Sequence, residues 1–299
     1  MPLFTLFLFI SGLAVLSTIH FREKIEAQAR TFLAVPISGS FTHKVVRASF
    51  IWDSFEIRGI QYFPKDAQDP VRIKRVIVSE IGRKFLFKVA RNGLLVPDKF
   101  KLGIVGLQTS VSNFPPETAQ FLRELGYESV YLSLSAEVIM SRASERMELR
   151  KVVADVSDAG RFVFTMTLDH ISIPRDMDSI ASVFQFSKLL ESPEWQSALV
   201  TSLDFEFRNQ TLTNRLAQRS RDRGEDGPFA WMGIGPRTVA SGSIDFTSLT
   251  ARKLSQLTEG RGIRIRMEPS TPVPVSEFSF SEFRDLNSAQ KKFGLSHLE

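Results

Sequence analysis

The stretch Arg161–Asp169, RFVFTMTLD, carries the clearest structural signal in the chain. Its apolar residues, which alternate with mostly polar neighbours, are Phe162, Phe164, Met166 and Leu168. A period of two residues is typical of a β-strand with one buried face and one solvent-exposed face. Leu199–Arg208, LVTSLDFEFR, repeats the pattern with Phe205 and Phe207. We therefore predict two strands that each place Phe side chains on one face.

The same alternation recurs on both sides of these two stretches. It is found at Phe55 and Ile57, at Val71 and Ile73, at Val130–Ala136 and at Gly262–Met267. The alternation is interrupted at Val152 and Val153, which indicates a β-bulge. Asn92–Gly93 is typical of a two-residue hairpin turn. These signals favour antiparallel strands.

Helical patterns interrupt this series of strands and do not alternate with it. They are Pro116–Leu125, Pro174–Leu190, Thr211–Arg223 and Ser248–Leu257. Without regular strand–helix alternation, a parallel βαβ fold is disfavoured. We predict an α+β protein whose mainly antiparallel, curved sheet has interspersed helices and a helical C-terminal part.

The N-terminus contains an uncharged apolar segment, Leu3–Ile19. Its length is close to the roughly 20 residues that cross a bilayer, and we predict a transmembrane helix. A cleaved secretory signal is the alternative, but no basic residue precedes the segment and the best cleavage site, Ala27–Ala29, lies behind charged residues. Basic residues follow the segment, which favours a cytoplasmic body, although large domains are translocated largely regardless of charge.

The expected domain organisation has four parts. Residues 1–21 form the transmembrane anchor and residues 22–40 form a linker that contains the breaker cluster Pro36–Ser40. Residues 41–208 form a β-rich domain, and residues 209–299 form a mixed helical and strand C-terminal region.

Composition excludes several kinds of chemistry. The 299 residues contain no Cys and only 4 His, so disulfides, thiol nucleophiles and Cys-ligated metals are excluded. Gly233-Ile234-Gly235 lacks the third glycine of a dinucleotide loop, and no nucleophile or metal motif is present. We predict a protein that is not an enzyme and has no cofactor, no metal and no nucleic-acid partner.

Phenylalanine dominates the aromatic residues, with 26 Phe against 3 Tyr and 3 Trp. A Phe ring has no polar group, so these rings either pack a large dry core or line a surface that meets an apolar partner. The net charge of +5 is a mild bias toward anionic surfaces.

The densest basic patch lies in the predicted helix after residue 208. Arg215 and Arg219 are four residues apart and therefore share one helix face. Near a membrane such a face would bind anionic lipid headgroups. A solvated helix face is the alternative, because acidic residues dilute the patch.

The C-terminal segment Gly260–Pro269, GRGIRIRMEP, followed by Pro272-Val273-Pro274-Val275, resembles uncharacterised single-pass envelope proteins of Gram-negative proteobacteria and, more loosely, AsmA-like proteins. The similar stretch covers roughly residues 203–278. This resemblance implies a single-pass inner-membrane protein with its body in the periplasm and a curved sheet whose inner face contacts lipid. It implies no catalytic residue.

We expect a membrane-anchored protein that binds or handles lipid non-covalently. The candidate lipid-binding residues are Phe162, Phe164, Phe205 and Phe207, and the candidate headgroup residues are Arg215 and Arg219. The alternative is an anchored scaffold or assembly factor that binds an envelope protein through the helices from Thr211 onward.

Overall fold

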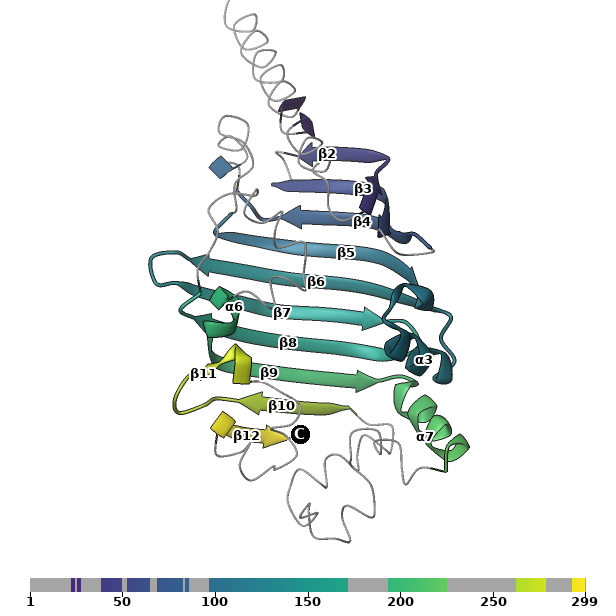
Figure 1. The fold of residues 1–299 in the computed structure, drawn as a ribbon. Helices are drawn as coiled ribbons and strands as arrows, with labels where there is room; N and C mark the ends of the chain where they lie inside the picture. The colour runs from purple at the N-terminus through teal and green to yellow at the C-terminus, as the bar shows by residue number, and fades with distance from the viewer. Residues whose placement is uncertain are drawn as a thin grey trace, which may run out of the picture.

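The computed structural model describes residues 23–24, 26–27, 39–49, 53–64, 69–82, 84–85, 97–171, 193–224, 262–277 and 292–298. These residues form one 12-stranded sheet in which all paired strands are antiparallel (Figure 1). The strands are β1 (Gly39–Thr42), β2 (Val45–Ser49), β3 (Ser54–Pro64), β4 (Val71–Ser79), β5 (Lys99–Ser110), β6 (Ser129–Ser141), β7 (Arg146–Val156), β8 (Gly160–Asp169), β9 (Leu199–Asn209), β10 (Ile263–Met267), β11 (Val273–Pro274) and β12 (Leu295–Leu298).

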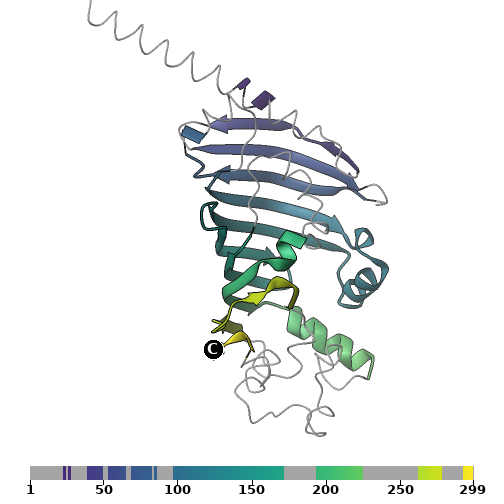
Figure 2. The same cartoon turned by 60° about the vertical axis from the view of Figure 1, so that its left-hand side comes forward.

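The strand order follows the chain. It is β1-β3-β4-β5-β6-β7-β8-β9-β10-β12, with β2 paired to β3 and β11 paired to β9. Neighbouring strands are therefore mostly consecutive in sequence, as in a meander. Figure 2 shows that the sheet is twisted, so that β2–β4 and β9–β12 are seen from different angles in the same view.

Short helices lie at the two ends of the strands (Figure 1). The helices at one end are η1 (Val111–Asn113), α3 (Pro116–Glu124) and α7 (Leu212–Asp222), and those at the other end are α6 (Pro193–Ser197) and η3 (Val275–Glu277). Pro116 occupies the first turn of α3, where a missing N–H costs no intrahelical bond, and Gly126, with φ of 79°, follows the helix end.

The antiparallel sheet predicted from the alternating residues is confirmed. Arg161–Asp169 and Leu199–Arg208 form β8 and β9, which pair with each other, and the strand predicted at Gly262–Met267 is β10. The helices predicted at Pro116–Leu125 and Thr211–Arg223 correspond to α3 and α7. The predictions at Asn92–Gly93, Pro174–Leu190 and Ser248–Leu257 lie outside the described residues.

The expected transmembrane helix and helical C-terminal part are corrected. No helix among the described residues is both long enough and apolar enough to span a bilayer, which contradicts the assignment to a single-pass inner-membrane protein with a periplasmic body. The predicted anchor segment, Leu3–Ile19, lies outside the described residues. After α7, the described C-terminal residues mainly extend the sheet through β10, β11 and β12, because the alternating residues of β10 pair with β9.

Bulges keep the apolar residues of the long strands on one face. In β5 the register to β6 shifts between Ile104 and Leu107, where Gly106 has φ of 65°. In β7 the register shifts between Leu149 and Val152, where Lys151 has φ of 48°, which confirms the predicted bulge. At each bulge the two flanking apolar residues are three positions apart in sequence, whereas a regular strand places residues of one face two positions apart. The extra residue of the bulge therefore keeps both apolar residues on the same face.

Candidate functional site

One face of the sheet carries apolar residues in register across eight strands. Each residue of this set pairs with the next one on the neighbouring strand. The set runs Val46, Ile57, Val76, Ile104, Leu134, Ala154, Phe162 and Phe207, from β2 to β9. We call the side of the sheet that carries these residues the apolar face.

Two further rows lie on the apolar face beside the first. One row runs Ala48, Phe55, Val78, Leu102 and Ala136, from β2 to β6. The other runs Phe100, Val138, Leu149, Met166, Leu203 and Met267, from β5 to β10. The apolar face is therefore a continuous surface in both directions, along the strands and across them.

The opposite face carries charged side chains that pair with one another. The pairs include Glu56–Arg58 at 2.7 Å, Glu137–Lys99 at 3.1 Å, Glu148–Arg150 at 2.6 Å and Asp204–Arg264 at 2.7 Å. Hydrogen bonds from these cations are the largest cause that lowers the pKa of each of the four carboxyl groups. The side chains of these four cations are all at least 47% exposed, so the ion pairs are solvated.

The described helices cover the apolar face at the two ends of the strands. At one end Phe207 is 5% exposed and packs with Leu125 next to α3 and Leu216 of α7. At the other end Leu168 is fully buried in a cluster that includes Trp195 of α6 and Val275 of η3. Both ends are therefore ordinary hydrophobic core.

The middle of the apolar face is only partly buried. This holds for Val76, Leu102, Ile104, Leu134 and Ala136, which lie on β4, β5 and β6. Adjacent strands thus present a patch of apolar side chains that retain some contact with solvent. A contiguous apolar surface of this kind is typical of a binding site.

The four predicted lipid-binding phenylalanines lie together on the apolar face. Phe162 and Phe207 have ring centroids 4.7 Å apart, and Phe162 and Phe205 have centroids 6.3 Å apart. Phe164 pairs in register with Phe205. Phe207 is enclosed by the helices, whereas Phe162, Phe164 and Phe205 are partly buried.

The two predicted headgroup arginines contact the neighbouring helical segment. Arg215 Nη1 donates a hydrogen bond to the carbonyl oxygen of Leu125 at 2.8 Å, and its guanidinium lies 4.4 Å from the ring centroid of Tyr127. Arg219 is 8% exposed and donates from Nε to Glu124 at 2.9 Å. These contacts fasten α7 to α3, so the headgroup role of Arg215 and Arg219 stays a prediction and is not part of the proposal below.

Glu124 is the carboxylate that α7 binds. Burial raises its pKa, but hydrogen bonds from Arg219 and Gln120 and the charge of Arg223 outweigh that effect, and the net pKa is lowered. Glu124 therefore remains ionised at neutral pH and can hold two arginines of α7.

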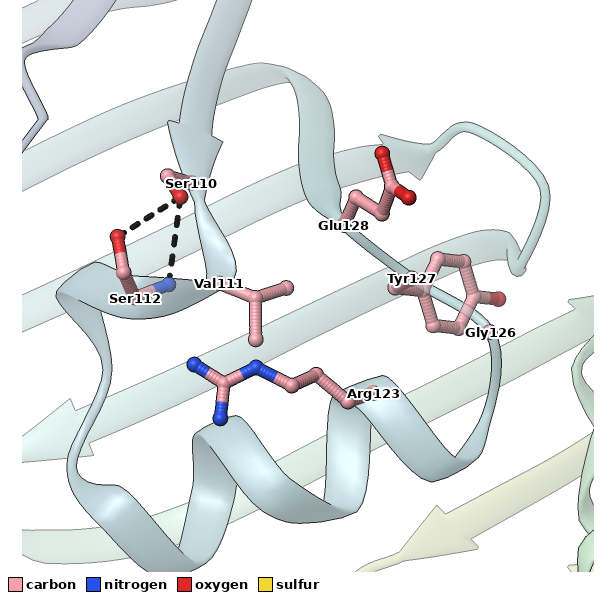
Figure 3. Close-up of a pocket in the computed structure, with 7 residues that line it drawn as sticks. All are labelled: Ser110, Val111, Ser112, Arg123, Gly126, Tyr127 and Glu128. Carbon is pink, nitrogen blue, oxygen red and sulfur yellow. Dashed lines mark hydrogen bonds between the residues drawn. The ribbon is translucent and has the colours of Figure 1, made fainter.

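A pocket of about 490 Å³ lies where β5 ends and β6 begins (Figure 3). Its lining residues are Ser110, Val111, Ser112, Arg123, Gly126, Tyr127 and Glu128. The volume is in the range of small-molecule sites. Sequence patterns did not single out Arg123, because a basic residue in the last turn of a helix is common and the opposite wall comes from another element.

No protein-family model and no curated protein matches this sequence.

Proposed function

We propose that the protein binds the acyl chain of a lipid non-covalently on the apolar face between β3 and β8. The observation that carries this proposal is the row of paired apolar residues across eight strands, of which the central members are only partly buried. An acyl chain is long, narrow and uniformly apolar. It can therefore follow such a row without needing a polar partner at any point.

The energy of this binding comes from removal of apolar surface from water. Each buried methylene contributes about 0.8 kcal/mol. Ten methylenes therefore contribute about 8 kcal/mol, and the costs of association and ordering lower the net binding free energy below that value. No bond is formed or broken in this process.

The charged opposite face supports binding on one side only. Its carboxylates and cations form ion pairs such as Glu56–Arg58 and Glu148–Arg150, which an acyl chain could not replace. Covering them would remove charges from water without new partners. The two faces therefore differ in what they can bind, and the apolar face is the one that fits a hydrocarbon.

The alternative expectation, a scaffold that binds a protein through the helices from Thr211 onward, has less support from α7. The side of α7 that carries Leu216 and Arg219 is buried against the α3 region. Its exposed side carries Asn214, Gln218 and Arg221. A polar helix side of this kind is typical of solvent exposure.

Binding of a fluorescent long-chain fatty acid to the whole protein tests the proposal. Leu134→Asn places an amide in the middle of the apolar face, and Ser135→Asn places the same amide on the opposite face of the same strand. We expect Leu134→Asn to weaken binding at least tenfold and Ser135→Asn to leave it unchanged.

Circular dichroism and thermal unfolding of both variants show whether the fold is retained. A folded Leu134→Asn variant that binds the fatty acid as well as the parent protein would contradict the proposal. Absence of saturable binding to the parent protein would contradict it too.

A further inference from the structure

The pocket at the end of β5 has two differently charged sides. Figure 3 shows the Arg123 side chain extending from α3 beneath Val111 toward Ser112, while Glu128 stands on the other side of the pocket. Val111 is 2% exposed and provides an apolar floor. The pocket therefore combines a cation, an anion and an apolar base within one small volume.

The serine hydroxyls of the pocket are already engaged. Ser112 Oγ donates to Asp69 Oδ2 at 3.2 Å, and the Oγ atoms of Ser110 and Ser112 are 2.8 Å apart. Because the single hydroxyl hydrogen of Ser112 goes to Asp69, Ser110 is the donor to Ser112. Neither hydroxyl is left to donate to a ligand, so recognition of an anion depends on Arg123.

Arg123 and Glu128 are exposed, and neither forms an ion pair with any residue that the structure describes. The arginines of the adjacent α7 differ, because Arg219 and Arg223 both pair with Glu124. One pocket thus contains a cation and an anion that are separate from each other. A ligand with one negative and one positive group can place the negative group at Arg123 and the positive group at Glu128. A ligand with only one kind of charge would be repelled by one of these two residues.

Tyr127 connects this pocket to the apolar face. It lines the pocket, and its ring packs against the cluster of Phe207, Leu125 and Leu216, which also contacts Phe162 and Phe205. Its hydroxyl donates to the Asp158 carbonyl at 2.6 Å, which fixes the ring in place. The polar pocket therefore borders the enclosed end of the apolar face, with one aromatic residue between the two.

We propose that this pocket binds a zwitterionic amine–phosphate headgroup, with the phosphate at Arg123 and the ammonium at Glu128. The inference rests on the proposed function, because it assigns the headgroup end of a lipid whose acyl chain lies on the apolar face. The guanidinium of Arg123 offers two parallel donors to phosphate oxygens, and the carboxylate of Glu128 accepts from the ammonium.

Calorimetric titrations of the whole protein with three soluble probes test the charge pattern. The probes are glycerophosphoethanolamine, which carries both charges, glycerol 3-phosphate, which carries the negative group alone, and ethanolamine, which carries the positive group alone. We expect glycerophosphoethanolamine to bind at least fivefold more tightly than either of the other probes.

Two substitutions assign the charges to residues. Arg123→Gln should weaken binding of glycerophosphoethanolamine at least tenfold. Glu128→Gln should lower the affinity for glycerophosphoethanolamine to the affinity for glycerol 3-phosphate. It should leave the affinity for glycerol 3-phosphate unchanged. The matched controls Arg72→Gln and Glu145→Gln remove the same charges at exposed positions outside the pocket lining and should leave the affinity unchanged.

The fatty acid assay separates this inference from the proposed function. Fatty acid binding without glycerophosphoethanolamine binding would overturn the inference and leave the acyl-chain proposal standing. Binding of glycerophosphoethanolamine without fatty acid binding would contradict the acyl-chain proposal and support a pocket for a free zwitterion. Equal affinity for glycerophosphoethanolamine and glycerol 3-phosphate would overturn the zwitterionic assignment.

Discussion

The apolar face has two regions, an end enclosed by helices and a middle that is only partly buried. Both regions carry apolar residues in the same rows, and they differ in the elements that surround them. At the α3 and α7 end, Phe207 is enclosed by Leu125 and Leu216. In the middle, Ile104 and Leu134 belong to the same row and pair with each other in register, yet both are only partly buried. A strand pattern therefore identifies the apolar face, whereas the covering elements decide whether that face is core or binding surface.

The largest effect should come from truncation of the enclosed region. Phe207→Ala removes a ring packed between α3 and α7 and should cost about 3–5 kcal/mol in the free energy of unfolding. Phe164→Ala, on the neighbouring strand and partly buried, should cost about half as much, because less of its surface is removed from water on folding. Urea unfolding of both variants gives the comparison. Equal losses would show that the two regions do not differ in packing.

A bulge variant should have the next largest effect, because it acts on the register that aligns the two regions. A Cβ atom at Gly106 would lie 3.1 Å from Cβ of Lys74, at a φ of 65°. Gly106→Val should therefore destabilise the protein by about 2 kcal/mol or more. Gly82→Ala is a useful reference, because φ is 79° there and no atom lies within 4 Å of the added Cβ.

Thermal unfolding of the Gly106→Val and Gly82→Ala variants compares a substitution at the bulge with one at a glycine of positive φ that has open space around it. We expect the larger fall in Tm for Gly106→Val. A smaller loss at Gly106 than at Gly82 would contradict the structural role of the bulge.

A substitution in the middle of the apolar face should change binding more than stability. Leu102→Asn should lower the free energy of unfolding by only about 1–2 kcal/mol, since the side chain is partly buried, and should weaken fatty acid binding at least tenfold. Unfolding and binding are measured on the same preparation. A large loss of stability would place this residue in a closed core.

The smallest effect concerns pH and the charged face. The carboxyl groups of Glu56, Glu137, Glu148 and Asp204 have lowered pKa values in the folded state, so their stabilising contribution is present above their unfolded pKa values. It is lost as the pH falls below about 4 and these groups become protonated. Tm should therefore fall between pH 5 and pH 3, and Glu148→Gln should flatten that fall slightly. Because none of these groups lies on the apolar face, Glu148→Gln should leave the fatty acid affinity of the folded protein equal to that of the parent protein at every pH above 5.

The sequence was sufficient to predict the strands but not their coverage. Alternation in Arg161–Asp169 and Leu199–Arg208 identified β8 and β9 and the face that carries their Phe residues. This was possible because the alternation of side chains between the two faces depends only on neighbouring residues of one strand. Enclosure of Phe207 could not be predicted, since it depends on contacts with α3, far away in the chain.

The helix face of Arg215 and Arg219 shows the same limit. Their spacing of four residues correctly placed them on one side of α7, but the pattern could not show that this side meets Glu124 and Tyr127 and not solvent. The headgroup candidate Arg123 was missed for the complementary reason. Its pocket forms only when the end of β5 is brought opposite α3.

Photo-crosslinking maps which residues contact the acyl chain. A fatty acid with a diazirine in the middle of its chain is bound to the whole protein and irradiated, and the modified residues are identified by mass spectrometry. We expect adducts on apolar-face residues of β4 to β8, such as Val76, Leu102 and Leu134, that disappear with excess unlabelled fatty acid. Competed adducts confined to the charged face or to the exposed side of α7 would contradict it.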